Sequence, residues 1–218
     1  NDCFQIHGGA AYFDDSPLGR MLRDARINQI GEGSNEVLTS FIALVGMRGP
    51  GMEFKEILDT VLKPWRAERG KAWGAGIKRL SAAVKVPEVP VRHDSLRSYA
   101  SQLGRLVWRF NFAVNKALIT YREPVMDMQL IQERIANAAM ELFATTCVLS
   151  RWDSELGTSG RNGHGATTEH IAADLFVRRS LRKIKEALRD LGDNDDAAML
   201  ATANAVLGKT KAHGKNGG

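Results

Sequence analysis

The chain has 218 residues with a net charge of +5, and 44% of its residues are hydrophobic. It is long enough to bury a core and has the composition of a globular protein, and no run approaches the roughly 18 consecutive apolar residues of a membrane span. Acidic and basic residues alternate as on solvated helix faces, without a zinc-ligand spacing or a nucleic-acid motif. We therefore expect no metal site and no nucleic-acid partner. Cys3 and Cys147 are expected to be unpaired thiols, buried or unreactive, in a reducing compartment.

The first 50 residues predict helices separated by glycines and a proline. The chain starts Asn-Asp-Cys-Phe, and we expect it to be the C-terminal part of a longer protein, with residues 1–9 ending a helix. A loop over 10–16 leads to a helix over 17–30, which has a proline at its favourable first position. The next helix, over 34–47, is apolar around most of its circumference and should be deeply packed. Residues 48–51, Arg-Gly-Pro-Gly, should end it and form a domain boundary.

The rest of the chain predicts a second helical unit. Weaker helical patterns cover 53–62 and 65–84, and two prolines then indicate an extended linker. Apolar residues spaced three and four apart predict helices at about residues 95–121, 127–156, 167–191 and 193–207. Because no strand pattern is present, we expect an all-α fold. Four parts follow: the end of one helical domain at 1–50, a helical linker region at 51–92, an antiparallel helical bundle at 93–208 and a disordered tail at 209–218.

One short stretch, residues 29–36, is a candidate for chemistry. Glu32 stands between Gly31 and Gly33, which allow the backbone to turn without side-chain strain. Ser34 or Asn35 can cap the following helix, and Glu36 suits the positive end of its dipole. A carboxylate at such a junction can project into a cleft as a general base, although an exposed polar loop residue is the simpler interpretation.

Three motifs in this region occur in the order found at the C-terminal end of the acyl-CoA dehydrogenases. They are Gln5-Ile6-His7-Gly8-Gly9, then Arg20-Met-Leu-Arg-Asp-Ala-Arg-Ile27, then Glu32-Gly33-Ser34-Asn35-Glu36. Three ordered motifs are more specific than a lone glycine pair. The chain therefore resembles this family closely over residues 1–48. More faintly, the remainder is similar to the extra C-terminal domain of the very-long-chain subgroup.

The resemblance implies FAD-dependent α,β-dehydrogenation of an acyl-CoA thioester. Glu32 matches the family's catalytic base, and its backbone N–H would also polarise the thioester carbonyl, with Gly33 beside the substrate. The positions that match flavin contacts, some to the FAD of a neighbouring subunit, are Gln5, Ile6, Gly8, Gly9, Ser34, Asn35 and Glu36. The cations of the second motif and Asp24 are assigned to structural ion pairs. Ala11 and Gly31 depart from residues common at these positions in the family.

The resemblance also implies partners and a location. They are a long-chain acyl-CoA as substrate, an electron transfer flavoprotein as oxidant and a second copy in a homodimer. The setting would be fatty acid β-oxidation in a bacterial cytoplasm, or in a mitochondrial matrix or at the inner membrane. Most FAD and substrate contacts of this family would precede Asn1, so the chain alone is expected to be inactive.

Two other functions remain open from the sequence. Residues 52–218 could serve chiefly as a dimerisation module, or as a peripheral membrane module through the tryptophans and cations of residues 63–80. A helix packed on its own bundle is the simpler interpretation of that segment. The third alternative is an inactive homologue that serves as an interaction protein, and the presence of Glu32 argues against it.

Overall fold

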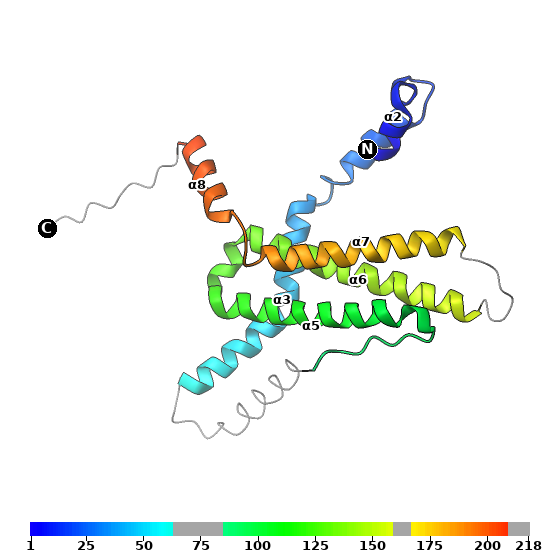
Figure 1. Cartoon of the computed structure of the whole chain (residues 1–218). Helices are drawn as coiled ribbons and strands as arrows, with labels where there is room; N and C mark the ends of the chain where they lie inside the picture. The colour runs from blue at the N-terminus through cyan, green and yellow to red at the C-terminus, as the bar shows by residue number, and fades with distance from the viewer. Residues whose placement is uncertain (63–84, 159–166, 209–218) are drawn as a thin grey trace.

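The computed structural model describes residues 1–62, 85–158 and 167–208 (Figure 1). All regular secondary structure in these residues is helical, which confirms the predicted all-α fold. The expectations for the segment 65–84, for the glycine-rich stretch after residue 158 and for the tail from 209 lie outside the described residues.

Three long helices form the body of the molecule. They are α5 (Arg97–Tyr121), α6 (Gln129–Thr158) and α7 (Thr168–Asp190), and they lie side by side in Figure 1. Their facing stripes make a core that includes Leu103, Leu142, Leu149, Leu181 and Ile184. Burial of such side chains stabilises the bundle by roughly 1.5–3 kcal/mol each. The predicted stripes are confirmed here, because their spacing of three and four places them on one face of each helix.

The start of α7 departs from its predicted stripe. Ile171 and Leu175, which the pattern assigns to the core, are 62% and 54% exposed, so this part of the prediction is wrong. Val177, two residues after Leu175, is by contrast fully buried. The buried stripe of α7 therefore begins later than the sequence suggests.

Helix α3 (Asn35–Leu62) is longer than predicted and contains Pro50 in its interior. The predicted helix end at residues 48–51 is therefore wrong. Pro50 has no N–H to donate, so one helix hydrogen bond is missing there. Ala43 and Met47, just before it, are buried against α5 and α6 in a second apolar cluster, and that packing holds the helix across the proline. The division of the chain at residue 50 stays a prediction.

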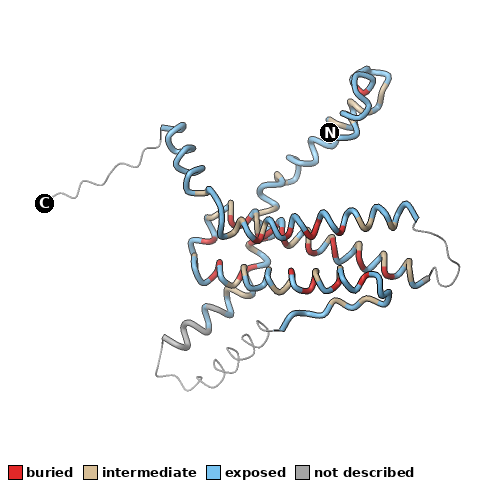
Figure 2. Tube along the Cα trace, in the orientation of Figure 1, coloured by how far each residue is buried: buried red, intermediate tan, exposed pale blue. Residues whose placement is uncertain are grey.

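The N-terminal segment extends away from the bundle (Figures 1 and 2). It comprises α1 (Asp2–Ile6), the 3-10 helix η1 (Gly8–Tyr12), α2 (Leu18–Ile27) and the first turns of α3. Val37, Phe41 and Val45 on α3 are 63%, 62% and 55% exposed. The expected deep packing around this helix is therefore wrong for the described residues, because only the side with Ala43 and Met47 meets the bundle.

Three short elements complete the structure. Residues 85–96, called the strap below, lie along the bundle and end in η2 (Asp94–Leu96), whose Leu96 is fully buried in the core. The 3-10 helix η3 (Glu123–Asp127) joins α5 to α6. Helix α8 (Asp196–Val206) projects from the end of α7 (Figure 1) and has no buried residue.

Candidate functional site

The turn before α3 carries the candidate base. Helix α2 ends at Ile27, and the Gly31 N–H still donates to the Ile27 carbonyl at 2.7 Å. Glu32 itself then takes a positive φ of 57°, followed by Gly33 at 108°. The sequence analysis assigned the unusual turn to the two glycines and missed the left-handed backbone of Glu32. Residues other than Gly rarely adopt this conformation. The Glu32 side chain is exposed.

Ser34 is the residue that caps α3. Its hydroxyl accepts a hydrogen bond from the Val37 N–H at 3.5 Å, and its carbonyl accepts from the Leu38 N–H at 3.0 Å. This confirms the prediction of a cap at Ser34 or Asn35 and selects Ser34. The next N–H, that of Asn35, donates to the Gln29 carbonyl at 3.1 Å and closes the turn around Glu32.

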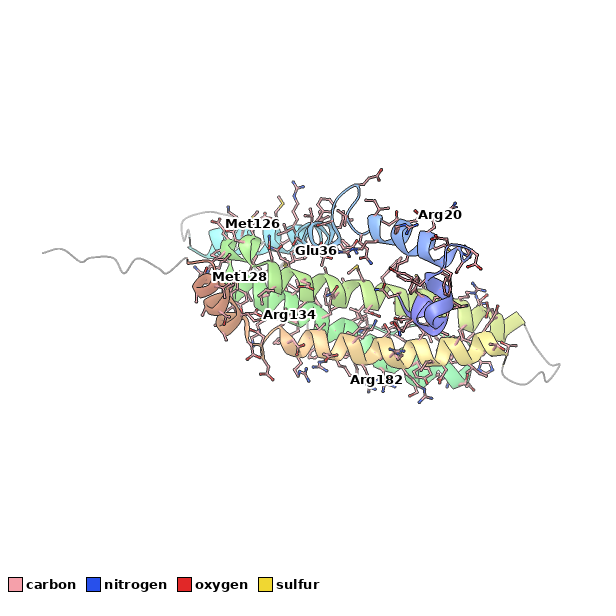
Figure 3. The ribbon with its side chains drawn as sticks, turned by 90° about the horizontal axis from the view of Figure 1, so that it is seen from above. Arg20, Glu36, Met126, Met128, Arg134 and Arg182 are labelled. Carbon is pink, nitrogen blue, oxygen red and sulfur yellow. The ribbon has the colours of Figure 1, made fainter. Side chains whose placement is uncertain are left out.

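Glu36 lies in the first turn of α3 (Figure 3), as expected for a carboxylate at a helix N-terminus. Its own backbone N–H lowers the pKa of Glu36, and the Ser34 hydroxyl and the charge of Arg26 act in the same direction. The Glu36 carboxylate is therefore ionised at neutral pH and is a poor proton acceptor. The lowered pKa therefore argues against Glu36 as a base.

The glycine pair of the first motif stands in an open position. Gly8 has a φ of 57°, and an added Cβ at Gly8 or Gly9 would meet no atom within 4 Å. The pair starts the 3-10 helix η1 instead of a loop, so the predicted loop over residues 10–16 is wrong in its first part. Ala11 is fully buried. Exposed backbone N–H groups without side chains suit the approach of an anionic group such as a diphosphate.

The candidate residues fall into two groups along α2. Gln5, Ile6, Gly8 and Gly9 are exposed and belong to α1 and η1, which pack against α2. The Glu32–Glu36 motif follows the other end of α2, a helix about 15 Å long. The structure thus places both groups on one helical unit, without bringing them into a single cleft within the described residues.

The basic motif between these groups contains one of the predicted ion pairs. Arg20 pairs with Asp24 at 3.9 Å, and both side chains are mostly exposed. The Arg26 guanidinium donates to the Gln29 side-chain oxygen at 2.6 Å, which fixes the end of α2 near the turn. Cys3 and Cys147 are free thiols, as expected, and both are exposed, so of the two expected alternatives only an unreactive thiol stays a prediction.

Sequence reasoning missed one further feature, a cavity of about 900 Å³ beside the middle of α3. Its walls come from α3, the end of α5 and η3. No local sequence pattern predicts this cavity, because its lining combines residues more than 70 positions apart in the chain. Among the helices that the structure describes, none is long and apolar enough to cross a membrane.

Comparison with known proteins defines the class of this fold and turn. Residues 1–46 match the family described as the acyl-CoA dehydrogenase C-terminal domain. Residues 94–212 match the ACAD9/ACADV C-terminal domain. The second match covers more than half of the chain, and the chain belongs to this ACAD9/ACADV C-terminal family.

Individual relatives agree with this assignment. The chain is 28% identical over 196 residues to the very long-chain specific acyl-CoA dehydrogenase of Homo sapiens, covering 88% of this chain and 29% of that protein. An acyl-CoA dehydrogenase of Bacillus subtilis is 53% identical over 36 residues, 16% of this chain and 10% of that protein. A crystal structure of an acyl-CoA dehydrogenase complexed with FAD, from Bacillus anthracis, has the same fold, with a TM-score of 0.65 at 20% identity over 98% of this chain and 33% of that one.

The chain therefore spans less than a third of the length of the very-long-chain relatives that it matches.

Proposed function

We propose that this chain is the C-terminal part of an FAD-dependent acyl-CoA dehydrogenase and that Glu32 is its catalytic base. The observation that carries the proposal is the turn at residues 28–36, where an exposed carboxylate with a positive φ precedes a capped helix. Family membership and the relatives' names support the reaction class. Because the chain covers only part of those relatives, the activity belongs to the longer protein.

The reaction makes clear demands on a protein. The α C–H of a thioester is weakly acidic, so its removal needs a positioned base and stabilisation of the enolate oxygen. The Glu32 carboxylate would take the α proton, and the Glu32 backbone N–H would donate to the thioester oxygen. FAD, when bound, supplies a hydride acceptor for the β carbon. Enclosure by substrate would desolvate Glu32 and raise its basicity.

The residues for the cofactor fit what the structure provides. Gly8 and Gly9 present backbone without a nearby side chain, as a diphosphate requires, and Ser34 and Asn35 at the start of α3 are proposed as further contacts. Gln5, Ile6 and Glu36 complete the proposed FAD contacts. Gly33, directly after the base, would lie against the substrate.

The finer parts of the proposal concern substrate, partners and place. We assign a long-chain acyl-CoA as substrate, an electron transfer flavoprotein as electron acceptor and a homodimer as the assembly. The work would take place in fatty acid β-oxidation, in a bacterial cytoplasm or in mitochondria. The relatives' names support the acyl length, and the other assignments follow from the family resemblance.

The test uses the longer protein that carries this chain. Its flavin spectrum is followed under anaerobic conditions while palmitoyl-CoA is added, for wild type and for Glu32→Gln. Wild type should bleach, and the variant should retain FAD but reduce it roughly 10²–10⁴-fold more slowly, as expected for loss of a general base. Glu88→Gln, at an exposed strap position, is the matched control and should behave as wild type.

Two results would contradict the proposal. If Glu32→Gln bleaches at the wild-type rate, the base is another residue. If the FAD bound to wild type is not bleached by any acyl-CoA, the enzyme assignment fails and the interaction-module alternative replaces it. The 218-residue chain by itself should neither retain FAD nor reduce it, and tight FAD retention by this chain would contradict the proposed need for preceding residues.

A further inference from the structure

The middle of α3 borders an apolar groove, the cavity of about 900 Å³ described with the candidate site. Its floor and walls are mostly hydrocarbon or thioether, contributed by Leu44, Met47, Met52, Leu118, Val125 and Met126. Met126 lies beside α3 in Figure 3, on the edge formed by η3. A volume of this size falls within the range of about 300–1,000 Å³ that is typical of small-molecule sites.

The mouth of this groove is positively charged. Arg48, Lys55 and Arg122 line it together with one carboxylate, that of Glu123, so the lining carries three cations and one anion, a net charge of +2. Lys55 and Glu123 form an exposed pair at 3.8 Å. Arg48 and Arg122 form no side-chain hydrogen bond or ion pair within the described part of the chain. An apolar groove with unpaired guanidinium groups at its mouth is complementary to an amphiphilic anion.

Arg122 is held in an unusual backbone conformation. It ends α5 with φ 52° and ψ −136°, a region in which Gly is far more comfortable than a residue with a side chain. Strained residues of this kind cluster at ligand clamps, where surrounding structure holds them in place. The backbone here would tolerate Gly, yet the chain carries a guanidinium group at the mouth of the groove.

We propose that this groove binds a single-chain amphiphilic anion, a long-chain fatty-acid carboxylate. The alkyl chain would lie over Met47, Leu118 and Val125, and the carboxylate would bind Arg48 and Arg122. The site lies about 20 Å from Glu32 along the axis of α3, so it is separate from the proposed dehydrogenation site.

A second copy of the chain fits the groove less well. Symmetric pairing of two grooves would bring the same surface of each copy together, so two mouths of net charge +2 would face each other. Like charges at an interface are unfavourable and disfavour that assembly. A carboxylate instead neutralises the mouth, and an alkyl chain matches the apolar lining.

Binding can be measured with cis-parinarate, a fluorescent fatty-acid carboxylate, and with its uncharged methyl ester. The protein is the longer protein that carries this chain, in its Glu32→Gln form so that no turnover occurs. One saturable site is expected for the anion, with much weaker binding of the ester. The double variant Arg48→Ala with Arg122→Gly should weaken parinarate binding roughly tenfold or more, as expected for losing charge-assisted hydrogen bonds. Arg122→Gly suits the backbone at that position, and Arg182→Ala on the outer face of α7 (Figure 3) is the control for charge.

A second pair of variants tests the cavity itself. A Cβ at Gly51 would meet only the Leu118 side chain, at 3.8 Å, so Gly51→Leu fills the groove without a backbone clash. Gly49→Leu changes the same helix where an added Cβ meets no atom within 4 Å. Gly51→Leu should abolish binding of parinarate, whereas Gly49→Leu should keep it within about twofold of wild type, because exposed positions contribute little.

Three outcomes would overturn the inference. The first is wild-type binding by both the groove-filling and the charge variants, and the second is equal binding of acid and ester. The third is a dimer that Gly51→Leu dissociates in the absence of any fatty acid, which would make the groove an interface between copies. These readouts require neither flavin reduction nor Glu32. A negative result for the groove therefore does not contradict the proposed dehydrogenase activity, and a negative result for that activity does not contradict the proposed fatty-acid site.

Discussion

Asp153 on α6 fastens the strap to the bundle. Its buried carboxylate accepts hydrogen bonds from the Arg92 N–H, at 2.9 and 3.0 Å, and from the His93 N–H at 2.8 Å. The His93 N–H has the largest effect and the Arg92 N–H the next largest. Both lower the pKa of Asp153 because they bind its charged form. The Asp153 carboxylate thus supplies hydrogen-bond acceptors to backbone N–H groups that would otherwise lack a partner in this extended segment.

Asp153→Asn should lower the melting temperature, because an amide offers one acceptor oxygen to these donors and places an NH₂ group against them. The folded-state pKa of Asp153 lies below its unfolded value, so its stabilising contribution is present above about pH 4 and is lost as pH falls through the folded pKa. The difference in melting temperature between wild type and variant should therefore be largest near neutral pH and shrink in acid.

Thermal unfolding of both proteins from pH 7 to pH 3 checks this expectation. Asp15→Asn, at an exposed position of the N-terminal segment, serves as the control for removing one carboxylate. A difference that stays constant over the whole range would mean that ionisation of Asp153 does not hold the strap.

Backbone conformation at two residues was invisible to sequence reasoning. Glu32 and Arg122 are the non-glycine residues with positive φ in the described part of the chain. Each such conformation costs on the order of 1–3 kcal/mol. At Glu32, the neighbouring glycines indicated a turn but did not indicate which residue takes the positive φ.

At the level of whole elements, α3 shows how packing decides where a helix lies. Pro50 loses one hydrogen bond and would break an isolated helix. Within the chain, Ala43 and Met47 are 2% and 4% exposed against α5 and α6, so packing on the bundle anchors the helix directly before Pro50. Apolar burial of this kind outweighs a local propensity.

Helix α8 is attached chiefly through charge. The Arg134 guanidinium on α6 donates to both carboxylate oxygens of Asp196, at 2.6 and 2.5 Å, and both side chains are more than 80% buried. The hydrogen bonds from Arg134 lower the pKa of Asp196, and the same contact raises the pKa of Arg134. Met199 and Leu200 on α8 stay more than half exposed, so apolar packing contributes little to its position.

Arg134→Ala should release α8 and destabilise the chain by about 1–3 kcal/mol, between the values for exposed and for buried pairs. Hydrogen exchange of amides 196–206 should accelerate strongly, while amides in the middle of α7 keep their protection. Arg105→Ala, at an exposed position on α5, is the control and should leave α8 unchanged. Unaltered exchange in α8 after Arg134→Ala would show that other contacts hold the helix.

At the scale of the whole molecule, α3 joins the two parts that match different families. Its first turns carry the Glu32–Glu36 motif, and its middle is buried in the bundle. The turn is thus connected through α3 to a packing contact with the bundle, and the helix continues through residues 48–51. A helix is stiff along its axis, so the position of the turn depends on how α3 packs against α5 and α6.

The strap approaches α5 most closely at Gly104. An added Cβ there would lie 2.4 Å from the Pro87 carbonyl oxygen, closer than real contacts allow. Helix propensity alone predicts that Ala at position 104 would stabilise α5 by up to about 1 kcal/mol. The structure predicts the opposite sign, because the strap or the helix must move.

Gly104→Ala should therefore destabilise the chain by about 1–3 kcal/mol, the range for overpacking. Gly49→Ala on α3, where a Cβ meets no atom within 4 Å, should instead stabilise it by up to about 1 kcal/mol. Urea unfolding of the two variants and wild type measures both signs together. A stabilised Gly104→Ala protein would show that the strap does not pack on α5 in solution.

Much of the fold was predictable because it rests on local regularities. The stripes of α5 and α6, including Leu103 and Leu149, follow the 3.6-residue period, and the Ser34 cap follows from a hydroxyl three residues before an N–H that it can reach. The carboxylate of Glu32 between two glycines likewise stood out from its neighbours alone. Each of these features depends on residues within a few positions of one another.

The tertiary structure decided what depends on pairs of distant residues. The sequence does not record that Asp153 meets Arg92, that Gly104 lies under Pro87, or that η3 closes a groove against α3. It also could not show which face of α3 meets the bundle, so Val37 and Phe41 were assigned to a core that the described residues do not build around them. Burial and close approach depend on two surfaces that meet. A local sequence pattern describes only one of these two surfaces.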